Sequence, residues 1–149
     1  MAIGEICTRE VVFVNRDVTV HAACKLMRQY HVGSLVVVDE KRGRLVPVGI
    51  LTDRDIVVEI DAMELDAKVI TAGDIMSQDL VTVPEDHGVL ETIEIMRVKG
   101  VRRVPIVDSE NGLIGIVAID DLLAVLAEEL TDIARIMVRE QSHEQQARR

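Results

Sequence analysis

The sequence reads Val-Gly-Ser-Leu-Val-Val-Val-Asp at residues 32–39 and Val-Arg-Arg-Val-Pro-Ile-Val-Asp at residues 101–108. Each stretch contains a short continuous apolar run, which is typical of a strand buried on both faces. The two stretches are 69 residues apart, and the same offset pairs Ile6–Val14 with Ile75–Val83. A register kept over this length indicates an internal duplication, and we refer to its two copies as repeat 1 and repeat 2.

The offset falls to 66 after the apolar run, because Gly49 corresponds to Gly115. Repeat 1 therefore has three extra residues in one loop. We expect this loop, Lys41–Arg44, to be solvated. The apolar spacing in repeat 1 predicts a helix, with Thr19 as its N-cap. The elements expected in repeat 1 are an extended piece Val11–Val14, this helix over Val20–Tyr30, strands Leu35–Val38 and Val46–Leu51, and a helix Arg54–Met63.

Repeat 2 predicts the same β-α-β-β-α order, with strands at Val81–Val83, Val104–Val107 and Leu113–Val117. Asn111-Gly112 is a strong hairpin signal between the last two strands. A unit of about 60 residues is marginally stable alone, so we expect the two sheets to pack face to face. The predicted fold class is α+β: two repeats related by a pseudo-two-fold axis, with an extended C-terminal helix.

The predicted domains are repeat 1 at 1–63, a linker at 64–73, repeat 2 at 74–126 and a C-terminal extension at 127–149. A helical pattern runs from Asp120 to about Glu140, and we expect Ser142–Arg149 to be a frayed polar tail. The helix is longer than one repeat needs, so we predict a homodimer in which its apolar stripe takes part. The stripe consists of Leu122, Leu126, Leu130, Ile133 and Met137, with Leu123 and Ile136 beside it.

Composition argues against several kinds of protein. The formal net charge is −9 and the only aromatic residues are Phe13 and Tyr30, which disfavours nucleic-acid binding. No apolar stretch approaches a membrane span, and the N-terminus does not resemble a signal peptide. Cys7 and Cys24 are read as reduced core thiols of a cytoplasmic protein. The spacing of histidines and cysteines predicts no metal site, and we find no catalytic motif.

The order, spacing and duplication of these stretches resemble the CBS-domain (cystathionine-β-synthase-type) family, over roughly Ile6 to Leu126. The resemblance implies a stand-alone tandem pair, called a Bateman module. Such pairs bind adenosine-containing ligands (AMP, ADP, ATP, NAD or S-adenosylmethionine) in a cleft between the repeats. They usually regulate another protein and usually dimerise, with no required cofactor and no enzymatic activity.

The family's ligand motif is Gly-hydrophobic-hydrophobic-Thr/Ser-x-x-Asp, which repeat 1 matches with Gly49, Thr52 and Asp55. A helix N-terminus favours phosphate, and the two side chains offer hydrogen bonds to ribose. Arg54 is a further candidate for phosphate. The alternative for Thr52 and Asp55 is a capping box that serves helix stability alone. For Arg54 the alternative is a solvated surface side chain.

Repeat 2 departs from this motif, because Ala118 replaces the threonine while Asp121 keeps the acidic position. We therefore expect two unequal sites, with the better one in repeat 1. Arg102 and Arg103 stand where repeat 1 has Gly33 and Ser34, and the family often places basic residues there to reach phosphate. Their alternative role is a solvated pair at a strand edge.

Adenine is expected against the positions that begin each repeat, where the resemblance places Val11, Val12, Leu80 and Val81. Their backbone would read the base and their side chains would enclose it, without aromatic stacking. Plain core packing is the alternative. Thr8 and Ser77 precede these positions and add candidate hydroxyls. The predicted function is nucleotide sensing with signalling to an unknown partner, and the alternative is a structural or interaction dimer with no ligand.

Overall fold

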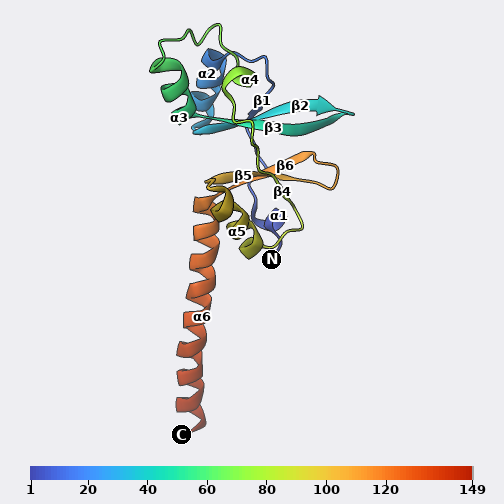
Figure 1. Cartoon of the computed structure of the whole chain (residues 1–149). Coiled ribbons are helices and arrows are strands. Elements are labelled where there is room, and N and C mark those ends of the chain that lie inside the picture. The colour runs from blue at the N-terminus through green and yellow to red at the C-terminus, as the bar shows by residue number, and fades with distance from the viewer. Residues whose placement is uncertain (149) are drawn as a thin grey trace. The chain divides into compact units, whose positions relative to one another are not determined.

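The computed structural model describes residues 1–148 (Figure 1). The chain forms two compact units, the first covering Met1–Val117 and the second beginning at Ala118. The first unit contains two three-stranded sheets, with strand orders β1-β2-β3 and β4-β5-β6. Figure 1 shows one sheet lying over the other. The predicted α+β fold with duplicated sheets and a long C-terminal helix is confirmed.

Repeat 1 forms the first sheet and the helices beside it. Strand β2 runs parallel to β1 and antiparallel to β3, with a bulge between Val37 and Val38. Helix α2 begins where predicted, because the Thr19 hydroxyl accepts a hydrogen bond from the Ala22 N–H at 3.2 Å. The elements are β1 (Phe13–Val14), α2 (Val20–Tyr30), β2 (Ser34–Lys41), β3 (Arg44–Thr52), α3 (Asp53–Ile56) and a π-helical turn η1 (Val57–Asp61).

Repeat 2 builds the second sheet in the same order. The turn between its last two strands is closed by Asp108, whose carboxylate accepts from the N–H groups of Glu110 and Gly112. This confirms a turn at the Asn111-Gly112 signal. The elements are β4 (Val83–Pro84), α5 (Val89–Lys99), β5 (Arg103–Val107) and β6 (Leu113–Ala118).

Each repeat sends its leading segment to the other repeat. Helix α1 (Ile3–Ile6) lies beside repeat 2, where the Gly4 N–H donates to the Glu85 carbonyl at 2.9 Å. Helix α4 (Ala72–Ile75) lies beside repeat 1, where the Gly73 N–H donates to the Arg16 carbonyl at 3.0 Å. Figure 1 shows α4 near α2 and α1 near α5. The pairs are related by the 69-residue offset, so the exchange is symmetric.

The core of repeat 1 shows the energetic result of this exchange. Ala72 and Met76, from the segment that leads into repeat 2, are buried in the same cluster as Leu35, Val37 and Leu51 of repeat 1. Burial of a side chain of the size of Met76 contributes about 1.5–3 kcal/mol. Ile3, from the segment that leads into repeat 1, is fully buried and bonds to His87 of repeat 2. Neither repeat therefore has a complete core of its own. The domain boundaries given above stay a prediction.

The second unit is helix α6 (Ile119–Ala147). The frayed tail expected from Ser142 onward is wrong for residues up to Ala147, which continue the helix; Arg149 lies outside the described residues. The Ser142 hydroxyl donates to the Val138 carbonyl at 3.1 Å, which satisfies a polar side chain within the helix. The helix expected over Arg54–Met63 is shorter than predicted, because α3 passes into η1 and ends at Asp61.

Candidate functional site

Thr52 and Asp55 form a reciprocal pair where β3 ends and α3 begins. The Thr52 hydroxyl oxygen accepts from the Asp55 N–H at 3.1 Å, and Asp55 Oδ2 accepts from the Thr52 N–H at 2.8 Å. This is the capping box that the sequence offered as the alternative. The capping box leaves hydrogen-bonding capacity on both side chains, because the Thr52 O–H remains a donor and a carboxylate has about four lone-pair sites. The cap therefore fixes both side chains and leaves them able to bind.

The first residues of β2 lie beside this corner. Ser34 is paired with Thr52 across the sheet, and the Asp53 N–H donates to the Gly33 carbonyl at 3.0 Å. A Cβ at Gly33 would come within 3.2 Å of Asp53 Oδ2, so a glycine permits this close approach. The Arg54 side chain is exposed beside them. The structure thus brings together Gly33, Ser34, Thr52, Arg54 and Asp55, all of which were predicted site residues.

A pocket of about 410 Å³ opens next to this group. It lies between the leading strand of repeat 1 and helix α2, and it includes the predicted Val11 and Val12. Val32 lines the pocket and directly precedes Gly33 in the chain, and this connects the pocket with the Thr52 corner; the corner residues themselves do not line it. The complete lining is Glu10, Val11, Val12, Phe13, Leu26, Tyr30 and Val32.

Both aromatic residues of the chain line this pocket, which the sequence analysis missed. Phe13 is 45% exposed and Tyr30 is 52% exposed, so each presents much of its ring to solvent. The sequence analysis placed Tyr30 only as the last residue of the predicted helix Val20–Tyr30. The signal that identifies it is its place as the last residue of α2, one turn beyond the buried Met27. Glu10 is the one charged residue in the lining.

Ser77, from repeat 2, bonds to strand β3 of repeat 1. Its N–H donates to the Ile50 carbonyl at 3.0 Å, and its hydroxyl oxygen accepts from the Ile50 N–H at 3.3 Å. Ile50 is two residues before Thr52 on β3. Ser77 therefore belongs beside the repeat 1 corner. Thr8, its counterpart, exchanges backbone hydrogen bonds of 2.9 Å with Ile116 of β6.

The remaining predicted residues belong to repeat 2. Leu80 and Val81 are half-buried ahead of β4, Arg102 is exposed, and Arg103 is half-buried at the start of β5. Asp121 is in the first turn of α6, where its Oδ2 accepts from the Ala118 N–H at 2.8 Å. Ala118 has no hydroxyl, so this end of the repeat lacks the reciprocal bond of Thr52. Asp121 belongs to the second compact unit, and we describe it only within its own helix.

No cluster of three or more histidine, cysteine or acidic side chains within residues 1–148 is arranged to hold a metal ion. Cys7 and Cys24 are not joined to any other cysteine, and burial raises the pKa of both thiols. None of the helices described is both long and apolar enough to cross a bilayer.

Known proteins resemble this chain both in sequence and in structure. The family model "CBS domain" matches residues 3–62 and 72–128. The uncharacterized protein MK0525 of Methanopyrus kandleri is 39% identical over 125 residues, which cover 84% of this chain and 62% of that protein. The chain therefore spans less than two thirds of the length of this relative.

Two solved structures are similar over most of the chain. A putative signal-transduction protein with CBS domains from Burkholderia ambifaria superposes with a TM-score of 0.74 at 26% identity, covering 85% of this chain and 93% of that one. The CBS domain pair of protein MJ0100, in complex with 5′-methylthioadenosine and S-adenosyl-L-methionine, gives a TM-score of 0.72 at 25% identity, covering 85% and 99%. Because the family model matches both halves, the chain belongs to the CBS-domain family and contains two consecutive CBS domains.

Proposed function

We propose that this protein is a regulatory module that binds an adenosine-containing ligand at the repeat 1 corner. The observation that carries the proposal is the fixed Thr52–Asp55 pair together with the open pocket at Val11 and Val12. The ribose hydroxyls would donate to Asp55, and the Thr52 hydroxyl would donate to a ribose or phosphate oxygen. The adenine ring would occupy the pocket at Val11 and Val12. The complex of the related MJ0100 pair with two adenosine compounds supports this ligand class.

The proposed binding mode differs in two details from the one expected from the sequence. Phe13 and Tyr30 line the pocket, so an aromatic ring is available to stack on the base. Helix α3 covers only Asp53–Ile56, so its dipole gives phosphate little help. Charge for a phosphate would therefore come from Arg54, and from Arg102 or Arg103 of repeat 2. Glu10 in the pocket lining disfavours phosphate at that end.

We further propose that repeat 2 offers a second, weaker site involving Leu80, Val81 and Thr8. Ala118 has no hydroxyl to match that of Thr52 in repeat 1. Ligand would signal to an unidentified partner by favouring one arrangement of the repeats, which it can do only through its different affinities for the two arrangements. We expect no catalytic turnover, and free thiols at Cys7 and Cys24 suit a cytoplasmic setting.

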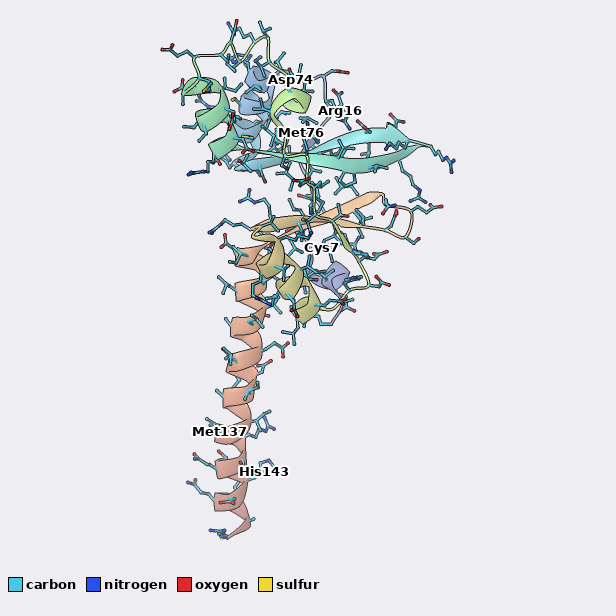
Figure 2. All side chains as sticks on the ribbon, viewed as in Figure 1. Cys7, Arg16, Asp74, Met76, Met137 and His143 are labelled. Atoms are coloured by element: carbon cyan, nitrogen blue, oxygen red, sulfur yellow. The ribbon has the colours of Figure 1, made fainter. Side chains whose placement is uncertain are left out.

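Helix α6 supports a homodimer as the signalling form. Leu122 is buried and Leu126 is half-buried, but the stripe is open further along the helix. Leu130, Ile133 and Met137 are 58–68% exposed, and Figure 2 labels Met137 on α6. An exposed apolar stripe of this length on one helix favours association. A second copy of the chain would cover it.

The test is thermal melting with AMP, ADP, ATP, NAD and S-adenosylmethionine, each added separately. A ligand at a hundred times its Kd adds about 2.7 kcal/mol of stability. Asp55→Asn keeps an oxygen that can accept from the Thr52 N–H but removes the charge, so it should lose the ligand response with little change in the ligand-free Tm. Asp74→Asn is the matched control. Asp74 caps α4 by accepting a hydrogen bond of 2.9 Å from the Thr71 N–H, and it does not line the pocket.

A melting temperature that none of the five ligands moves would favour the alternative, a structural or interaction dimer whose cleft binds no ligand. Loss of the response in both aspartate variants would show that capping, and not the Asp55 charge at the site, controls it.

A further inference from the structure

One acidic residue ends the buried strand of each repeat, and the two have different partners. In repeat 1, Asp39 forms a bidentate pair with Arg16 of the same repeat, at 2.9 Å from Nε and 3.1 Å from Nη2. The 69-residue offset places Asp108 at the equivalent position in repeat 2, and Glu85 where repeat 1 has Arg16. Glu85 has the wrong charge for this pair. Asp108 is therefore left without an arginine from its own repeat.

Arg44 of repeat 1 supplies the missing charge. Its Nη1 contacts Asp108 Oδ2 and its Nη2 contacts Glu110 Oε2, so one guanidinium group spans two carboxylates of repeat 2. Arg44 is in the loop that carries the three extra residues of repeat 1. Arg44 is exposed, as expected for this loop, and also makes these two ion pairs. The loop of repeat 1 thus contacts the aspartate of repeat 2, whereas Asp39, the equivalent aspartate of repeat 1, is paired within its own repeat.

The acceptor is positioned independently of Arg44. Asp108 Oδ1 accepts from the Glu110 N–H at 2.8 Å and from the Gly112 N–H at 2.9 Å. These two N–H groups, together with Arg44, hold the pKa of Asp108 below its ordinary value. Because the turn already fixes the carboxylate, Arg44 meets a preformed acceptor and not a mobile side chain.

Arg44 and Thr52 are the two ends of β3. A strand rises about 3.3 Å per residue, so they are separated by roughly 26 Å. The Ile50–Ser77 crossing between the repeats lies near the Thr52 end. From this arrangement we propose that Arg44 is a clamp that holds the hairpin ends of the two repeats together, at the end of β3 opposite the Ile50–Ser77 crossing, so that relative motion of the repeats is restrained at both ends of the strand. This clamp does not depend on the proposed ligand.

Amide hydrogen exchange of the full chain tests the clamp. Of the amides whose hydrogen bonds cross between the repeats, the informative ones are Thr8, Ser77 and Ile116, which bond across to or from the last strand of a repeat. Arg44→Ala should speed their exchange by about two- to fivefold. Fivefold is about the largest effect expected from the loss of one exposed ion pair. Asp108→Asn keeps an acceptor for the turn and should produce a smaller acceleration, because Arg44 keeps its contact with Glu110.

Arg16→Ala is the matched control, because it removes an arginine from the equivalent aspartate within one repeat; Figure 2 labels Arg16. The three crossing amides should exchange at the wild-type rate in this variant. Wild-type exchange of those amides in Arg44→Ala would overturn the proposal, even if the Glu110 and Gly112 amides became faster. Equal acceleration by Arg16→Ala would also overturn it, because the effect would then be general destabilisation.

Discussion

Gly49 lies directly against Met76, and a Cβ at Gly49 would come within 2.5 Å of the Met76 sulfur. Gly115 has the same relation to Cys7, again at 2.5 Å. Each glycine is the first residue of the ligand motif or of its counterpart. At both positions the leading segment of the other repeat crosses a strand so closely that no side chain fits.

Alanine at Gly49 or Gly115 should therefore destabilise the protein. Forcing a methyl group into a packed contact typically costs about 1–3 kcal/mol. Urea denaturation of each variant measures the loss. Gly88→Ala is the control, because no atom lies within 4 Å of the added Cβ; its cost should stay below about 1 kcal/mol. Equal losses at Gly49 and Gly88 would contradict the crowding explanation.

Removal of either aromatic ring should weaken adenosine binding if the base stacks in the pocket. Stacking of a base on an aromatic side chain contributes about 1–3 kcal/mol. Tyr30→Ala or Phe13→Ala should thus raise the Kd for the ligand that melting identifies by about 5- to 150-fold. Titration calorimetry measures it. Val98→Ala, at an exposed position of α5, should leave the Kd unchanged. An unchanged Kd in both aromatic variants would favour the binding mode predicted from the sequence, in which backbone groups recognise the base without aromatic stacking.

Charge placed on the α6 stripe should dissociate the proposed dimer. Leu130→Glu and Ile133→Glu put carboxylates on the exposed apolar face, where burial in an interface would be costly. Sedimentation velocity should show a dimer for the wild type and a monomer for each variant. Thr131→Glu adds the same charge at a neighbouring exposed position and should remain dimeric. A monomeric wild type would show that the stripe has another role.

Acid should destabilise the fold through three carboxylates with lowered pKa values. The Arg16 side chain lowers the pKa of Asp39, Thr71 lowers that of Asp74, and the Gly112 N–H leads the effect on Asp108. A carboxyl group with a lower pKa in the folded state stabilises fully above its unfolded pKa, about 3.9. That stability is lost as pH falls through the folded pKa.

Melting temperatures measured between pH 6 and pH 2 should therefore fall below about pH 4. The asparagine variants of these three aspartates should show a shallower decrease than the wild type. A decrease as steep as that of the wild type in all three variants would assign the acid sensitivity to other groups.

Both thiols should react slowly with alkylating agents. Burial raises the pKa of Cys7 and Cys24, which lowers the thiolate fraction at neutral pH. Mass spectrometry after iodoacetamide treatment at pH 7.5 should show each cysteine reacting more slowly than a cysteine in an unstructured peptide. Faster reaction at either position would show that the thiol is activated.

Much of the fold could be predicted because each strand corresponds to a short apolar run in the sequence. The runs Leu35–Val38 and Val104–Val107 lie in β2 and β5, and Thr19 caps α2 where predicted. The tail was mispredicted because Ser142 and its polar neighbours carry no apolar pattern, although a helix already started at Ile119 can continue through them.

The candidate site could be predicted only where its residues are close in sequence. Thr52 and Asp55 are three residues apart and share a motif, so their pairing was foreseeable. The contact of Arg44 with Asp108 and the placing of Tyr30 at the pocket depend on packing between distant segments. Residue type and spacing do not encode such contacts, because they arise from how the repeats cross.

The exchange of α1 and α4 has a consequence for any attempt to divide this protein. A cut between Glu64 and Lys68 would leave an N-terminal fragment without Ala72 and Met76, and a C-terminal fragment without Ile3. Each piece would carry what the other lacks. The two fragments should be unfolded separately and should regain structure when mixed, so the protein is a natural candidate for a split, self-complementing tag.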